Sequence, residues 1–131
     1  MKKILFVDDN NLFASRVAEL IIRKYYDFET FSCGVKVDRK VTDAESRALA
    51  EIGIDSLGYE PTHINEYAGQ KFDYVVVFTK MAMKYAKMTI HPKPMFILVD
   101  EIIDNDLTKC YNARNKTIDS VEHLFDIGAI E

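Results

Sequence analysis

An unbroken apolar run at residues 74–78, with the sequence YVVVF, constrains the fold more than any other feature of the chain. A strand with one face in water alternates polar and apolar residues, whereas both faces of this run are apolar. Strands of that kind belong to parallel sheets that are covered by helices on both sides. The run therefore predicts an α/β domain in which residues 72–78 form a buried strand.

Strands and amphipathic helices alternate along the rest of the chain. Strands are predicted at residues 3–7, 28–32, 72–78 and 95–99, with the last also buried, and helices at residues 12–24, 42–52, 81–88 and 107–128. This alternation predicts a parallel sheet with helices on both faces, and 131 residues fit a single domain. Because crossovers are right-handed, the carboxyl ends of the four strands should meet at one edge of the sheet.

Capping signals locate several helix ends. Thr42 and Glu45 have the spacing of a capping box, and Gly53 is a C-terminal stop. The segment 54–67 contains Gly and Pro, so it is expected to be loop with one short helical turn. The other expected caps are Asn10 or Asn11 for the first helix and Thr79 for the third, and further loops are expected at residues 35–41 and 100–106.

Charge and composition exclude several classes of function. A net charge of −4 argues against a nucleic-acid groove binder, because affinity for phosphate backbones comes from Lys and Arg. No apolar run reaches the roughly 20 residues of a membrane span, so no membrane partner is expected and a cytoplasmic location is the default. Cys33 and Cys110 are too few for a zinc site, and we expect no disulfide between them.

The junction between the first strand and the first helix is the predicted site. Ligands of open α/β sheets bind outside the carboxyl ends of the strands, against helix N-termini. Here the junction opens with Asp8 and Asp9, whose charges oppose an anion. Ser32, Thr79 and Asp100 follow the other three strand ends, so we expect them to form the rim of the site.

Two known families resemble this junction. Residues 4–10 look like the first strand and acidic pair of a response-regulator receiver domain, whose acidic residues help to hold magnesium. The receiver also needs a phosphoacceptor Asp after its third strand, and residues 77–79 offer none. It needs a Lys after a later strand, whereas Lys93 precedes residues 95–99. The receiver is therefore the weaker resemblance.

The chain resembles the low-molecular-weight protein tyrosine phosphatases, and the thiol-dependent arsenate reductases that share their fold, over nearly its whole length. That family begins with a strand, a C-x5-R-S loop and a helix carrying Ala-Glu. The matching residues here are Asn11, Ser15, Ala18 and Glu19 in the loop and helix; Ser32, Cys33 and Gly34; Glu51, Gly53, Ile54, Asp55 and Gly58; residues 72–76; and Tyr111, Arg114, Ile118 and Val121. The resemblance implies a three-layer domain with the strand order 2-1-3-4.

The departures from the family fall on its chemistry. With Ser15 in register, Asp8 stands where the resemblance places the nucleophilic cysteine, and Ala14 stands where it places the arginine that clamps the phosphoryl oxygens. Shifting the frame to use Arg16 breaks the match at Ser15, so that frame is rejected. Without the arginine, carboxylates in the loop repel a phosphate dianion.

The remaining catalytic positions of the family are also unmatched. Its general acid lies in an Asp-Pro loop after the fourth strand, where this chain has Asp100 and Asp104 without a following Pro. The arsenate reductases use further cysteines as a thiol relay, and Cys33 and Cys110 do not occupy those positions. No catalytic residue is therefore assigned from the resemblance.

The sequence favours a catalytically inactive member of this fold that acts as a binding or regulatory module. Its partner, a protein or a small molecule, would contact the rim of the former pocket. The alternative is metal-dependent phosphoryl transfer with Mg²⁺ held by Asp8 and Asp9, with Asp100 as a further ligand. A third interpretation gives these carboxylates only the favourable interaction with a helix N-terminus, about 0.3–1 kcal/mol.

The predicted third helix carries two stripes at helical spacing. Lys80, Lys84 and Lys87 form a basic stripe, which usually marks a solvated face. The methionines at positions 81, 83 and 88 fill a core or contact a partner. The three histidines are scattered along the chain without metal-ligand spacing.

Overall fold

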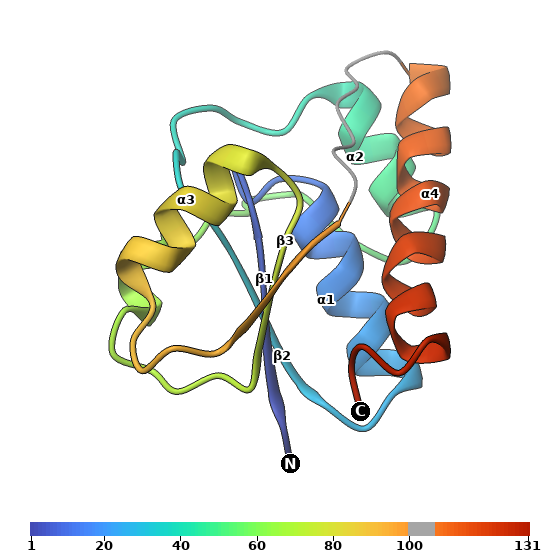
Figure 1. Cartoon of the computed structure of the whole chain (residues 1–131). Coiled ribbons are helices and arrows are strands. Elements are labelled where there is room, and N and C mark those ends of the chain that lie inside the picture. The colour runs from blue at the N-terminus through green and yellow to red at the C-terminus, as the bar shows by residue number, and fades with distance from the viewer. Residues whose placement is uncertain (100–106) are drawn as a thin grey trace.

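The computed structural model describes residues 1–99 and 107–131. The acidic loop expected at residues 100–106, with Asp100 and Asp104, lies outside the described residues. The strands are β1 (Lys3–Asp8), β2 (Glu29–Gly34), β3 (Tyr74–Val77) and β4 (Met95–Leu98); the helices are α1 (Ala14–Tyr25), α2 (Asp43–Ala50), α3 (Lys80–Thr89) and α4 (Leu107–Asp126), with a 3₁₀ turn, η1, at Ile64–Tyr67 (Figure 1).

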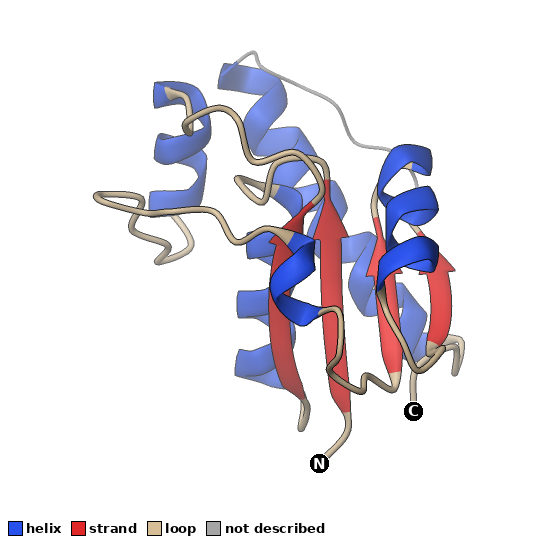
Figure 2. Cartoon of the chain, turned by 90° about the vertical axis from the view of Figure 1, so that its left-hand side faces the viewer, coloured by secondary structure: helices blue, strands red, loops and turns tan. Residues whose placement is uncertain are grey.

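The four strands form one parallel sheet in the order β2-β1-β3-β4, which confirms the predicted architecture. β1 pairs with β2 on one side and with β3 on the other, so its apolar residues are enclosed by neighbours. Val7, for example, lies opposite both Cys33 and Val77, and all three are fully buried. The strands point the same way, and their carboxyl ends lie at one edge (Figure 2).

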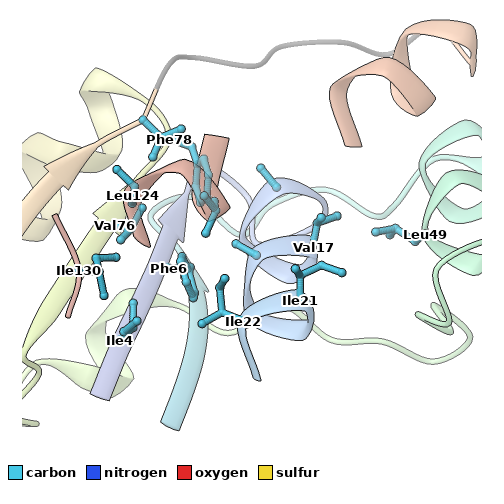
Figure 3. Packing of buried hydrophobic residues seen from close by; sticks show 14 residues of the cluster. Ile4, Phe6, Val17, Ile21, Ile22, Leu49, Val76, Phe78, Leu124 and Ile130 are labelled. Atoms are coloured by element: carbon cyan, nitrogen blue, oxygen red, sulfur yellow. The ribbon is translucent and has the colours of Figure 1, made fainter. Parts of the chain in front are cut away.

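Helices cover both faces of the sheet, as predicted. α1 packs against the sheet and against α4, with α2 beside α4, while α3 and η1 lie on the opposite face (Figures 1 and 2). Figure 3 shows the larger core cluster, in which Phe6 and Val76 of the sheet face Val17 and Ile22 of α1. No described helix has the length and apolar character needed to cross a bilayer.

The predicted caps are present at two helices. At α2 the Thr42 hydroxyl accepts from the Glu45 amide at 3.1 Å, and the Glu45 carboxylate accepts from the Thr42 amide at 2.9 Å. At α3 the Thr79 hydroxyl accepts from the Ala82 amide at 2.9 Å. Both helices therefore begin where a side chain satisfies amides that lack a helical partner.

Two expectations about the sheet and its first helix were wrong. β4 is an edge strand and is not buried on both faces, because Met95 and Leu98 are 58% and 48% exposed. α1 begins at Ala14, and neither Asn10 nor Asn11 caps it. Asn11 has a left-handed backbone, with φ of 57°, and Phe13, which directly precedes the helix, also has a non-helical backbone.

Candidate functional site

The chain between β1 and α1, residues 8–14, forms a loop at the carboxyl edge of the sheet. Its packing against the end of β2 requires a glycine. A Cβ atom added at Gly34 would lie 2.7 Å from the carbonyl carbon of Asn10 and 2.7 Å from the Asn11 nitrogen. The loop therefore lies directly on the backbone of β2, and this contact fixes its height above the sheet.

Asn11 holds the loop through four hydrogen bonds from a fully buried side chain. Its amide nitrogen donates to the hydroxyls of Ser15 and Ser32, both at 3.0 Å. Its amide oxygen accepts from the Tyr59 hydroxyl at 2.7 Å and from the Thr62 amide at 2.8 Å. One side chain thus ties α1, β2 and the segment that precedes η1 to the loop.

Ser32, expected at the rim, lies beneath the loop and is 6% exposed. Its hydroxyl donates to the Glu19 carboxylate at 3.0 Å, and that carboxylate accepts from Arg23 at 2.9 Å. Burial raises the pKa of Glu19, and the charge of Arg23 opposes that rise. The serine and the glutamate that match the family therefore continue the network of Asn11 into α1.

Asp8 lies at the base of the loop with its carboxylate turned inward. One oxygen accepts from the backbone N–H of Asn11 at 2.6 Å, and the other accepts from the backbone N–H of Ser15 at 2.9 Å. Because Ser15 is in the first turn of α1, Asp8 supplies the cap that the asparagines do not. Burial raises the pKa of Asp8 to about 6, although hydrogen bonds from Ser15 and Asn11 oppose the rise.

Unlike Asp8, Asp9 directs its side chain toward Thr79 at the start of α3. Its carboxylate accepts from the Thr79 hydroxyl at 2.6 Å, the same hydroxyl that caps α3. Its backbone oxygen accepts from the amides of Val35 at 3.0 Å and Lys36 at 2.7 Å. Asp9 and Thr79 therefore join the loop to α3, while the Asp8 carboxylate serves the loop itself.

Arg16 is engaged outside the loop. Arg16 stacks its guanidinium 3.4 Å from the centre of the Tyr59 ring and donates to Ser56 and to the Asp55 carbonyl. The rejection of a loop frame based on Arg16 stays a prediction from the sequence. Residue 14, where the family has its arginine, is a buried alanine.

Arg39 borders the site and was not identified from the sequence. It forms two hydrogen bonds to the buried carboxylate of Glu45, at 2.8 and 3.0 Å. With the Asn10 amide oriented to satisfy both of its partners, the Arg39 Nε donates to it at 3.2 Å and the Lys36 carbonyl accepts from it at 2.6 Å. No local motif marks this arginine, since only the folding of the 35–41 loop brings it to the site.

Metal ligands do not gather in the described part of the chain. Among residues 1–99 and 107–131, no group of three or more His, Cys, Asp or Glu side chains could hold an ion. The amide hydrogens that face Asp8 also carry partial positive charge, which opposes a cation at the same oxygens. A magnesium site at Asp8 and Asp9 stays a prediction from the sequence.

Cys33 is a structural residue of β2. It is fully buried, its thiol is free, and burial raises the thiol pKa. A thiol that does not ionise near neutral pH is a poor nucleophile. Cys33 therefore packs in the core beneath the loop, and the absence of a thiol relay stays a prediction from the sequence.

No protein-family model and no curated protein matches the chain, but solved structures do. A low-molecular-weight phosphotyrosine phosphatase from Vibrio cholerae O395 has a TM-score of 0.77 and 15% identity, covering 98% of this chain and 97% of its own. Vibrio vulnificus Wzb in complex with benzylphosphonate has a TM-score of 0.76 and 15% identity, and the match covers 95% of this chain and 97% of its own.

An arsenate reductase in the phosphate binding state has a TM-score of 0.73 and 21% identity, covering 96% of this chain and 98% of its own. Each of these structures matches at least 95% of this chain, so the likeness includes the helices as well as the sheet. The chain therefore has the fold of the low-molecular-weight protein tyrosine phosphatases and arsenate reductases, as the sequence predicted.

Proposed function

We propose that this protein is a non-enzymatic binding or regulatory module built on the fold of the low-molecular-weight tyrosine phosphatases. The observation that carries the proposal is the inward carboxylate of Asp8, which accepts from the amides of Asn11 and Ser15. A loop of this kind binds a phosphate through such amides. Here two of them are already used by a group of the protein that is itself an anion.

The charge of the loop supports the same proposal. With a pKa of about 6, Asp8 is mostly ionised at neutral pH, so it repels a phosphate dianion. A phosphatase offsets such repulsion with a guanidinium that clamps the phosphoryl oxygens. Residue 14 supplies no charge, and the guanidinium of Arg16 is held against Tyr59. The loop therefore has no cationic side chain that could bind a phosphoryl group or stabilise its transfer.

The rim of the loop is the proposed contact surface. Asn10 is half-buried, and its amide is held between Arg39 and the Lys36 carbonyl. Arg39 is exposed, yet its guanidinium is fixed by Glu45, so it presents its charge in one orientation. Rigid groups lose little entropy on binding, which suits a surface that recognises a protein or small-molecule partner.

Hydrolysis of p-nitrophenyl phosphate tests the loss of activity. The wild-type protein, with and without Mg²⁺, should show no turnover above buffer from about pH 5 to about pH 8, since the loop lacks both nucleophile and cation at any of these values. The double variant Asp8→Cys with Ala14→Arg restores the family residues, and a gain of activity in it would support the alignment. Turnover by the wild type that Asp8→Asn abolishes would refute the proposal, and dependence on Mg²⁺ would favour the metal-based alternative.

Phosphate binding tests the charge argument separately. Nuclear magnetic resonance titration with inorganic phosphate should leave the amide signals of residues 10–15 unchanged in the wild type near neutral pH. Asp8→Asn removes the negative charge and should allow phosphate-dependent shifts at these amides. Shifts of the same size in both proteins would show that Asp8 does not exclude the anion.

A further inference from the structure

The stretch from residue 74 to residue 99 contains no acidic residue, although the chain carries 21 Asp and Glu and a net charge of −4. The same stretch contains four lysines. All four are exposed: Lys80, Lys84, Lys87 and Lys93. A chain of net negative charge therefore carries a run of exposed lysines on α3 and just before β4.

These lysines are not neutralised by the described part of the chain. None of the four forms an ion pair with residues 1–99 or 107–131, whereas Arg23, Lys36, Arg39 and Arg114 each do. A cation without an ion-pair partner among these described residues keeps its charge for an outside ligand. What sets the basic stripe apart from other exposed lysines is that its members follow one another on a single helix without an acidic residue between them.

Large apolar side chains interrupt the lysines. Met81, Tyr85 and Met88 of α3 are 39%, 42% and 63% exposed, and Met95 of β4 is 58% exposed. The buried side of α3 is served by Ala82 and by other small or partly covered residues, so these four are not needed for the core. Methionine and tyrosine adapt to partners of different shape, and clustered exposure of this kind marks an interaction site.

A groove of about 540 Å³ lies where α3 ends and β4 begins. Its lining combines cationic and apolar groups, including Lys87, His91, Lys93, Met95 and Phe96. The groove adjoins the exposed face of α3 through Lys87, and it is near the amino ends of the strands. The loop at Asp8 is at the carboxyl ends, so the two regions are separate sites on the molecule (Figure 2).

We propose that the α3–β4 surface, comprising Lys84, Tyr85, Lys87, Met88, Lys93 and Met95, docks an acidic segment of a partner protein that also carries apolar side chains. Carboxylates of the segment pair with the lysines, and an apolar side chain enters the groove beside Met95. Charge complementarity selects an acidic partner and speeds its encounter. This surface is independent of the loop, so the proposal does not rest on the function proposed above.

A synthetic peptide provides the test. The probe is a fluorescein-labelled amphipathic helix with Glu on one face and Leu and Phe on the other, and its binding is followed by fluorescence anisotropy. Lys84→Glu with Lys87→Glu should weaken binding by about tenfold or more, because attraction becomes repulsion at two contacts. Lys24→Glu with Lys116→Glu makes the same change of net charge at exposed lysines of α1 and α4, and should leave affinity within about twofold.

The apolar part of the surface is tested by Met88→Ser, which should weaken binding several-fold while a poly-glutamate peptide shows no such loss. Amide shifts on peptide binding should fall within residues 80–96. Equal loss from both pairs of lysine reversals, or shifts confined to residues 8–16, would overturn the proposal. All variants are compared by circular dichroism, which should show an unchanged fold because every substituted residue is exposed.

Two other occupants give distinct results. If the lysine reversals abolish concentration-dependent dimerisation in sedimentation and the peptide does not bind, the surface contacts a second copy and the proposal is wrong. If the protein pellets with phosphatidylglycerol vesicles and again ignores the peptide, the surface binds a membrane and the proposal is equally wrong. Peptide binding that the α3 reversals alone weaken establishes the acidic segment.

Discussion

Replacing Asp8 by Asn should change how the stability of the protein depends on pH. Asp8 is 8% exposed, and its carboxylate accepts from the amides of Asn11 and Ser15. Asparagine has the same shape but stays neutral at every pH. The variant also loses one acceptor oxygen, which shifts its stability by an amount that does not depend on pH. Only the pH-dependent part reports the charge.

The magnitude follows from the pKa of Asp8, which burial raises from 3.8 to about 6. A carboxyl with a raised pKa in the folded state contributes stability that is fully present below 3.8 and is lost as pH rises through about 6. At about 1.36 kcal/mol per unit, the full loss is about 3 kcal/mol. Between about pH 5 and about pH 7 the loss is about 1.3 kcal/mol.

Urea unfolding of both proteins across this range measures the effect. Asp8→Asn should gain about 1.3 kcal/mol relative to the wild type as pH rises from about 5 to about 7. Glu19 and Glu45 titrate in both proteins, so their contributions cancel in the difference. Asp119→Asn, which makes the same substitution at an exposed residue of α4, is the matched control.

Two results would refute the reasoning. A stability difference that is constant with pH would mean that burial and the amide hydrogen bonds balance at Asp8. A difference of opposite sign, with the wild type gaining stability as pH rises, would mean that the amides outweigh burial and lower the pKa. In either case the carboxylate would be a well-stabilised anion, and the conclusion that burial raises its pKa would have to be abandoned.

Three further changes test the frame of the site. Asn11→Gly accommodates the left-handed backbone but removes the hydrogen bonds to Ser15, Ser32, Tyr59 and Thr62, the first two of which are buried, so urea unfolding should show a loss of about 3 kcal/mol. Gly34→Ala places a Cβ atom 2.7 Å from the loop backbone and should cost about 2 kcal/mol, whereas Gly69→Ala meets nothing within 4 Å and should cost far less. In a Cys110→Ser background, Cys33 should react with a thiol reagent only after unfolding by urea, and labelling at the rate of an exposed thiol would contradict its burial.

The sequence predicts the architecture well because the architecture depends on patterns that local rules describe. The apolar run at residues 74–78 and the alternation around it identify a covered parallel sheet. The caps at Thr42 and Thr79 were equally accessible, since each requires only an interaction with a residue three positions later. The strand order came from resemblance to a family, and the structure has that order.

The errors occur where distant residues decide the structure. The cap of α1 comes from Asp8, seven residues before Ser15, because Asn11 adopts a left-handed backbone and bonds to Thr62, 51 positions away. β4 has an apolar sequence that cannot show whether a strand lies at the edge or the centre of a sheet. Arg39 reaches the site through a loop whose path depends on Glu45 and Asn10.

Two backbone amides of the loop donate to an anion of the same chain, the Asp8 carboxylate, and these hydrogen bonds hold the loop in its conformation. The amides of Asn11 and Ser15 need an acceptor, and Asp8 provides one that is covalently attached and always present. A phosphatase must instead leave amides open for its substrate, and it relies on a cation to hold the anion there. On the function proposed above, the carboxylate of Asp8, which satisfies the loop without a ligand, would also repel phosphate. A carboxylate at residue 8 therefore stabilises the loop itself but, on this proposal, lowers its affinity for phosphate.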